Sequence, residues 1–198
     1  MYEEATSARR AYHHGSLEET LIVLGLEELE KTGDPDSLSV SALAKRAGVS
    51  RMAPYRHFAD REAFLQALAR RGFQRLGDQM QAVDTPDPWE AVTAFGVCYV
   101  KFAVDNPGAF RLMFGSAPPT PDQGQAEDPS TVLGLVMTRL SQLVDVGRRE
   151  DVFLTSWCLM HGLASLLVTR RIRNVHSSPV DLARRVARVL RQAIASAG

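Results

Sequence analysis

Apolar residues recur along this chain at the three- and four-residue spacing of amphipathic helices, and no stretch alternates convincingly as a strand would. The first helix is expected over residues 16–33, because Ser16 and Glu19 form a capping box at its start and Gly33 can end it. Eight more helices are expected over residues 39–47, 50–58, 60–80, 89–105, 108–114, 131–146, 151–173 and 180–195. The pattern therefore predicts an all-α protein of about nine helices.

The predicted helix starts in the second half of the chain share one motif, a small polar residue followed by proline at the first helical position. It occurs at Asp87-Pro88, Asn106-Pro107, Asp128-Pro129 and Ser178-Pro179. Residues 116–127, which are rich in proline and polar side chains, are expected to form a loop.

Two of the predicted helices lie close together within residues 39–58. Ser39 is a good N-cap for the first of them, and Gly48 stands where a helix end requires a left-handed residue. Ser50 can cap the second helix, in which Pro54 is expected to cost little because it comes so early. Two short helices joined by a glycine-containing turn form a helix-turn-helix unit, whose second helix lies in the major groove of DNA.

The charge distribution supports this interpretation. The whole chain has a net charge of zero, but residues 39–75 contain eight Lys and Arg residues against two carboxylates, a net charge of +6. Local charge decides phosphate binding, since salt screens contributions from beyond a Debye length of about 8 Å. A basic segment that coincides with a helix-turn-helix pattern therefore indicates a DNA-binding surface.

The same stretch resembles the DNA-binding domain of TetR/AcrR-type transcriptional regulators. The matching pattern is A-x-x-a-G-V-S-x-x-x-x-Y-x-H-F, here Ala44, Gly48, Val49, Ser50, Tyr55, His57 and Phe58. The resemblance runs upstream through residues 13–17 and downstream to about Leu68. It implies a flexible arm over residues 1–15, a three-helix DNA-binding head with its linker helix over 16–80, and a ligand-binding and dimerisation body over 81–198.

Arg51, Pro54 and Tyr55 share one face of the predicted second helix. Arg51 is expected to contact a guanine, while Met52 and Pro54 offer apolar contacts to a thymine methyl group. By the resemblance, Tyr55 and His57 contact phosphates; alternatively, Tyr55 packs against the first helix and His57 only covers the turn. Further DNA contacts are expected from Ser39, Lys45, Ser50 and Arg61.

The body resembles a branch of the same family that carries a Trp-x3-His-Gly motif on its long eighth helix. The motif is matched by Trp157, His161 and Gly162, and residues 106–114 resemble the short sixth helix of that branch. The resemblance implies a site for a small apolar molecule and a dimer interface formed by residues 151–173 and 180–195. The candidate ligand-binding residues, each of which could instead belong to an ordinary core, are Phe95, Tyr99, Phe102, Met113, Phe114, Trp157 and His161.

Other classes of site find little support. Cys98 and Cys158 are far apart in apolar segments and are interpreted as buried hydrophobes. His13 and His14 have no converging partners, so neither a metal nor another cofactor is expected. No catalytic motif is present, and the chain is not expected to be an enzyme. The sequence shows neither an apolar run of about 20 residues nor a signal core, so we expect a cytoplasmic protein without membrane contact.

These observations together predict a dimeric, sequence-specific transcriptional regulator. The expected form is a repressor that a small apolar ligand releases from an inverted-repeat operator in double-stranded DNA. The alternatives are an activator or architectural DNA-binding protein of the same fold that takes no ligand, and an enzyme or ligand-binding module with a vestigial helix-turn-helix.

Overall fold

The computed structural model describes residues 16–115, 131–172 and 177–196, and within these ranges the chain is α-helical with three short 3-10 turns and no strand. The expected arm over residues 1–15, with His13 and His14, lies outside the described residues, as does the expected loop over 116–127. The helices are α2 (Leu17–Thr32), α3 (Val40–Arg46), α4 (Arg61–Gln81), α5 (Pro88–Asp105), α6 (Pro107–Met113), α7 (Val132–Leu140), α8 (Arg149–Val168) and α9 (Pro179–Ser196).

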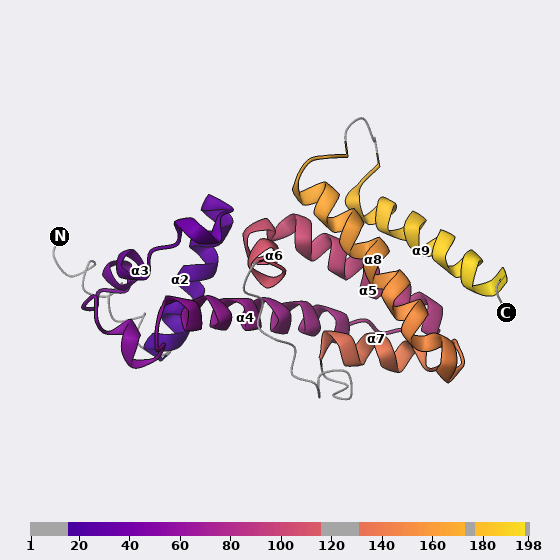
Figure 1. Cartoon of the computed structure of the whole chain (residues 1–198), viewed down its shortest axis with the longest axis horizontal. Coiled ribbons are helices and arrows are strands. Elements are labelled where there is room, and N and C mark those ends of the chain that lie inside the picture. Colours follow the sequence, from indigo (N-terminus) through magenta and orange to yellow (C-terminus); the bar gives the residue numbers. More distant parts are fainter. Residues whose placement is uncertain (1–15, 116–130, 173–176, 197–198) are drawn as a thin grey trace, which may run out of the picture.

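The molecule is elongated, with a small head at one end and a larger helical body at the other (Figure 1). The head consists of α2, α3 and the first part of α4, and α4 then runs lengthwise to the body. In the body, α5 packs against α7, α8 and α9. This is the all-α architecture that the sequence pattern predicts.

Local signals fix the ends of the head helices as predicted. The Ser16 hydroxyl accepts a hydrogen bond from the Glu19 amide at 3.3 Å, and Gly33 ends α2 with a φ of 65°. The Ser39 hydroxyl accepts from the Ala42 amide at 3.3 Å, which caps α3. Gly48 turns the chain after α3 with a φ of 74°, a conformation that only glycine adopts at little cost.

The second helix of the helix-turn-helix unit departs from its prediction. Residues 50–57 form successive turns, and only Pro54–Arg56 is helical, as a 3-10 segment. The Ala53 amide donates to the Ser50 carbonyl at 3.0 Å and the Arg56 amide to the Ala53 carbonyl at 3.2 Å. Pro54 has no N–H to donate to Ser50, and a proline ring crowds the carbonyl four residues earlier. The expectation that Pro54 costs the helix little is therefore wrong.

Helix α7 is shorter than predicted, because it ends at Leu140 instead of continuing to residue 146. A 3-10 turn, Val146–Arg148, then leads into α8. The Arg149 guanidinium donates to the carbonyls of Ser141 and Val144, both at 3.4 Å. The first residue of α8 thus donates to carbonyls of the C-cap of α7 and of the turn that follows it.

One hydrophobic core runs through the head and into the body. In the head, Phe58 packs edge-on against the fully buried Phe64, with ring centroids 4.9 Å apart. Each large side chain buried in this way contributes about 1.5–3 kcal/mol. The fully buried residues of this kind include Leu21, Leu29, Leu43, Phe64 and Leu68 in the head and Leu76, Phe102, Met113 and Leu140 further along the chain.

Helix α6 connects the body to the head a second time, independently of α4. The Glu30 carboxylate of α2 accepts from the amides of Ala109 at 3.1 Å and Gly108 at 3.4 Å, at the start of α6. A Cβ atom on Gly108 would lie 2.2 Å from the Leu29 carbonyl oxygen, so only glycine permits this approach. Asn106, expected to cap α6, makes no capping bond and instead donates to the Phe102 carbonyl at 3.0 Å.

Candidate nucleic-acid interface

Two arginines of the basic segment are held in ion pairs with α2. Arg46 donates to Glu28 at 2.9 Å and to Glu27 at 3.0 Å. Arg71 makes a two-point contact with the Glu19 carboxylate, with both N···O distances at 2.5 Å. The hydrogen bonds from Arg71 lower the pKa of Glu19. These pairs fix α2 against α3 and α4.

Arg61 is likewise engaged inside the head. Its guanidinium donates to the backbone carbonyls of Pro35 at 2.8 Å, Asp36 at 3.3 Å and Leu38 at 3.4 Å. The side chain is partly buried and ties the connection between α2 and α3 to the start of α4. This geometry argues against the expected phosphate contact of Arg61, because its Nε and Nη2 atoms already donate within the protein.

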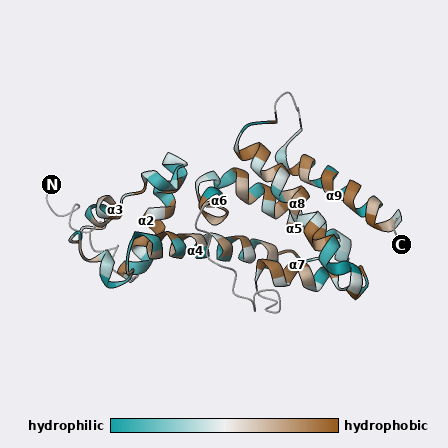
Figure 2. Ribbon diagram, viewed as in Figure 1, coloured by the Kyte–Doolittle hydropathy of each residue, from teal (hydrophilic) through white to brown (hydrophobic). Residues whose placement is uncertain are grey.

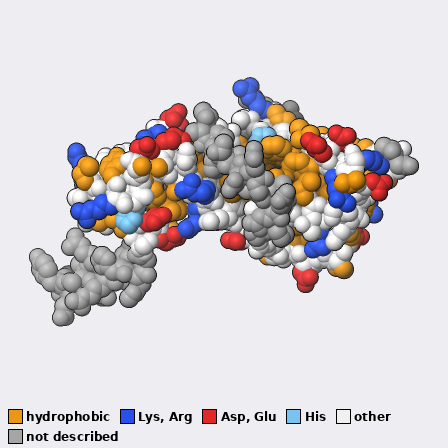
Figure 3. Space-filling model, turned by 60° about the horizontal axis from the view of Figure 1, so that its bottom comes forward, with side chains coloured by type: hydrophobic (Ala, Val, Ile, Leu, Met, Phe, Trp, Pro, Cys, Tyr) orange, Lys and Arg blue, Asp and Glu red, His pale blue; other side chains and the backbone are white. Residues whose placement is uncertain are grey.

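The remaining cations of the segment differ in this respect. Among the described residues, Lys45, Arg51, Arg56, Arg70 and Arg75 are exposed and make neither an ion pair nor a side-chain hydrogen bond. Figure 3 shows Lys and Arg side chains spread over the head, with acidic side chains among them. Pairing therefore divides the basic segment into arginines that hold the fold together and cations that are available to a partner.

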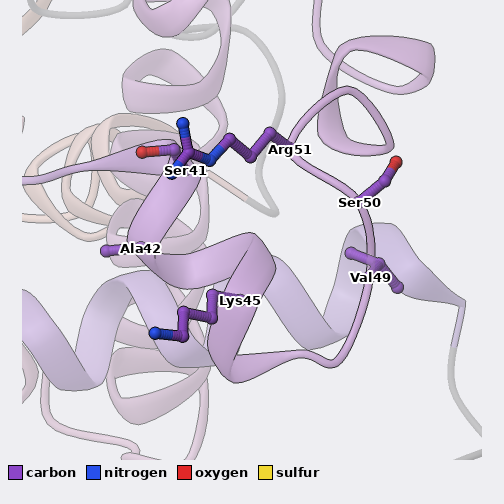
Figure 4. Close-up of a pocket in the computed structure, with 6 residues that line it drawn as sticks. All are labelled: Ser41, Ala42, Lys45, Val49, Ser50 and Arg51. Carbon is purple, nitrogen blue, oxygen red and sulfur yellow. The ribbon is translucent and has the colours of Figure 1, made fainter.

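Two of the available cations face the same hollow on the head. Its volume is about 470 Å³, and the side chains that line it are Ser41, Ala42, Lys45, Val49, Ser50 and Arg51. Figure 4 shows the Arg51 side chain extending from the turn back over α3, towards Ser41. Ser41 and Ala42 are not among the DNA-binding residues predicted from the sequence, although Ser41 lies one helical turn before Lys45 on the same face.

The turns after the hollow present some of the predicted DNA contacts and bury another. Met52 is 68% exposed and Tyr55 is 42% exposed. Pro54 is fully buried, which contradicts its expected contact with a thymine methyl group. His57 lies with its Nδ1 atom 3.9 Å from the Glu18 carboxylate, and Phe58 belongs to the core, as predicted.

In the body, His161 of α8 is surrounded by aromatic rings. Its ring centroid lies 4.9 Å from that of Phe114, 5.5 Å from Phe110, 6.2 Å from Tyr99 and 6.3 Å from Trp157. The Tyr99 hydroxyl and His161 Nδ1 are 2.7 Å apart. Burial raises the pKa of Tyr99 and lowers the pKa of His161, so both groups are neutral near pH 7. We therefore assign the hydroxyl as the donor and Nδ1 as the acceptor.

This cluster unites four of the seven candidate ligand-binding residues, Tyr99, Phe114, Trp157 and His161, and adds Phe110, which the candidate set omits. The other three are core residues. Phe95 and Phe102 are buried and make none of these ring contacts, and Met113 is buried where α6 meets Gly72 of α4.

Helix α8 also presents an apolar outer face. Its side chains Leu154, Trp157, Leu159 and Leu166 are between 42% and 46% exposed. Figure 2 shows hydrophobic residues recurring along both α8 and α9. Residues Val146–Val168 are long and apolar enough to cross a membrane by length and composition alone, and 28% of an 18-residue window within them is buried.

The two cysteines differ from their prediction. Cys158 on α8 is exposed and Cys98 on α5 is half-buried. Burial raises the pKa of the Cys98 thiol. The expectation of a buried Cys158 is wrong because α8 turns an apolar face outward. Across the described ranges, no three His, Cys, Asp or Glu side chains are grouped to hold a metal ion.

Comparison with known families gives two matches that together cover most of the chain. A family model described as "Bacterial regulatory proteins, tetR family" matches residues 24–68. A second, described as "Tetracyclin repressor-like, C-terminal domain", matches residues 92–197.

Similar proteins carry related names. An HTH-type transcriptional regulator of Mycobacterium tuberculosis is 32% identical over 95 residues, which are 47% of either protein. The regulator YobS of Bacillus subtilis is 30% identical over 96 residues, 48% of this chain and 50% of that protein. The chain thus spans about half the length of these curated relatives.

Solved structures share the fold over most of the chain. A protein of unknown function from Rhodococcus sp. RHA1 has a TM-score of 0.76 and 27% identity, over 92% of this chain and 97% of that one. A single-residue variant of TetR from Acinetobacter baumannii, in complex with minocycline, has a TM-score of 0.62 and 19% identity, over 90% of this chain and 94% of that one.

Proposed function

Because the chain belongs to the tetR family of bacterial regulatory proteins, a family of DNA-binding transcriptional regulators, we propose that it is a homodimeric repressor released from DNA by a small molecule. The DNA target is an inverted repeat in double-stranded DNA, and the protein acts in the cytoplasm. The observation that carries this proposal is the division of the head's cations into paired and available ones.

The DNA-binding face consists of the hollow and the turns that follow it. Within the described part of the chain, Lys45 and Arg51 have no acidic partner, and Met52 and Tyr55 project from the same segment. Phosphate contacts position such a domain, whereas contacts to base edges give its sequence preference. We retain Ser39, Lys45, Ser50, Arg51, Met52, Tyr55 and His57 as DNA-binding residues and remove Pro54 and Arg61.

Dimerisation accounts for the apolar outer face of α8. Leu154 and Leu166 are large apolar side chains that one protomer leaves in water, and a second copy would cover them. A two-fold pairing through α8 and α9 presents two heads to DNA. One short reading segment contacts few bases, but two heads spaced one helical turn apart, about 34 Å, read a palindrome.

The aromatic cluster around His161 is the proposed effector site. It combines apolar rings with the polar Tyr99–His161 pair, the composition typical of small-molecule sites. Phe110 and Phe114 connect the cluster to α6, whose first residues contact the head through Glu30. A ligand that separated these rings would therefore act on an element that also contacts α2.

A second candidate function is a regulator of the same fold that takes no ligand. The close ring contacts favour it, because Tyr99, Phe110, Phe114 and His161 already fill the space between them. Differential scanning fluorimetry of the protein with a library of small apolar compounds distinguishes the ligand-released repressor from the ligand-free regulator. A compound that raises Tm and weakens DNA binding supports the repressor, whereas a Tm that no compound moves supports the ligand-free regulator.

The experiment that tests the main proposal is selection of duplexes from a random DNA library by the purified full chain, followed by a salt titration on the enriched sequence. We expect an inverted repeat and a steep decrease of affinity with salt. Enrichment of no sequence would refute sequence-specific regulation.

A further inference from the structure

We propose that the hollow between α3 and the following turn binds one phosphate of the DNA backbone, held by Ser41, Lys45 and Arg51. This inference rests on the proposed function, because it takes DNA as the partner of the head. It assigns a position to the DNA strand and a role to Ser41, and it changes the role of Arg51.

The backbone explains why Ser41, Lys45, Ser50 and Arg51 line one opening. Ser41 and Lys45 lie one turn apart on α3, so they project from the same face of the helix. Gly48 reverses the chain, and the amide of Val49 donates to the carbonyl of Ala44 at 3.0 Å. This brings Arg51 back over α3 towards Ser41, whereas the Ser50 hydroxyl points away from α3, and all four residues line one opening (Figure 4).

The charges around the hollow point to an anion. Lys45 and Arg51 both line it, and within the described ranges neither has a carboxylate partner. The neighbouring Arg46 provides the contrast, since it is held by Glu27 and Glu28 of α2. Two unpaired cations at one opening repel each other, and a bound anion removes that cost.

The lining matches the chemistry of a phosphodiester. Its oxygens accept hydrogen bonds, and the hollow offers the Ser41 hydroxyl, the Lys45 ammonium and the Arg51 guanidinium as donors. Ala42 and Val49 form the apolar part of the lining. All six lining residues are exposed or half-exposed, so a DNA strand can reach the site without rearrangement.

This placement changes the expected role of Arg51. The sequence predicts that it reads a guanine from the first turn of a recognition helix. In the structure residues 50–53 form turns instead of an α-helix, and the Arg51 side chain lies back over α3 (Figure 4). Arg51 therefore positions the DNA, and residues that project further along the turn determine the sequence preference, among them Met52, which is 68% exposed.

The test combines single protein variants with single neutral phosphates. Each phosphate of one half-site of the selected operator is replaced in turn by an uncharged methylphosphonate, and binding is measured for the wild type, Lys45→Gln, Arg51→Gln and Arg70→Gln. We expect one replacement to weaken the wild type several-fold and to have no further effect on Lys45→Gln or Arg51→Gln. Both variants should also bind all sequences more weakly, with a salt slope shallower by about 0.9.

Arg70→Gln is the matched control, because it removes another exposed and unpaired arginine that does not line the hollow. It should keep the full sensitivity to that methylphosphonate. Circular dichroism confirms that each variant is folded, and Ser41→Ala provides a smaller change at the same site. The proposal is overturned if Arg51→Gln loses preference at one base pair only, or if the neutral phosphate weakens wild type and variants equally. A wild type that enriches no operator refutes the proposed function instead.

Discussion

The carboxylate of Glu30 accepts a hydrogen bond from the backbone amide of Ala109, a residue 79 positions later in the chain, at 3.1 Å. Glu30 belongs to the head and Ala109 to the short helix α6 of the body. A side chain from one part of the molecule thus caps a helix of the other. Carboxylates at helix N-termini are favourable both as acceptors and through the helix dipole.

Replacing Glu30 with alanine is therefore expected to destabilise the protein by about 1 kcal/mol, since caps of this kind contribute about 0.5–2 kcal/mol. Urea unfolding of the wild type and Glu30→Ala measures the effect. Glu30→Gln is the conservative comparison, because its amide oxygen still accepts one bond, and it should lose less. Equal stability of all three proteins would show that the contact contributes nothing.

Arg61→Ala should lower stability without changing the electrostatics of DNA binding. The substitution removes donors from three backbone carbonyls, and hydrogen bonds to charged groups contribute about 1.5–3 kcal/mol. We expect a lower denaturation midpoint and an unchanged salt slope. Arg56→Ala, which removes an unpaired surface arginine, should change stability by no more than about 0.5 kcal/mol. If the DNA affinity of Arg61→Ala instead decreased less steeply with salt than that of the wild type, Arg61 would be a phosphate contact.

Leu154→Glu tests the dimer. This side chain is 43% exposed on the outer face of α8, where a second copy would bury it. A charge buried without a partner opposes association, so sedimentation should show monomers at concentrations where the wild type is dimeric. Val104→Glu places the same charge on an exposed position of α5, at 36% exposure, and should leave the dimer intact. Dissociation by both variants, or by neither, contradicts an interface through α8.

The Tyr99–His161 pair predicts a dependence of stability on pH. Burial lowers the pKa of His161 below its ordinary value of 6.5 in the folded protein. The unfolded chain then takes up a proton at a pH where the folded protein does not, so stability falls as pH decreases through 6.5 and levels off below the folded pKa. Urea unfolding from about pH 8 to about pH 5 measures this loss. His161→Asn keeps an acceptor without the titration and should show a smaller loss, whereas an identical pH profile would assign the effect to other groups.

The sequence predicts the parts of this fold that are determined locally. The caps at Ser16, Gly33 and Ser39 depend on residues within four positions, and all three appear where the pattern places them. Resemblance to a family supplies the rest of the architecture. The Tyr99–His161 contact joins two candidates singled out for their chemistry, although nothing in their spacing shows that they meet.

The predictions fail where the partner of a residue lies far away in the sequence, or where one proline changes the path of the backbone. Arg61 finds its carbonyl acceptors 23 to 26 residues away, and a local pattern treats it as a free surface cation. Asn106 stands where a helix cap is expected, but the carboxylate of Glu30 on α2 accepts the hydrogen bonds of the first α6 amides instead. The prediction for Pro54 considers only its lost hydrogen bond, whereas its ring also prevents the chain from closing an α-helical turn around Ser50.

Helix α4, whose 21 residues connect the head to the body, acts geometrically as a rigid arm about 31 Å long. Each degree of tilt at the body end displaces the head end by about 0.5 Å. Two such arms moving symmetrically in a dimer change the separation of the heads by about 1 Å per degree. A rotation of about three degrees in each arm therefore suffices to change the separation of the heads by the rise of one base pair, about 3.4 Å.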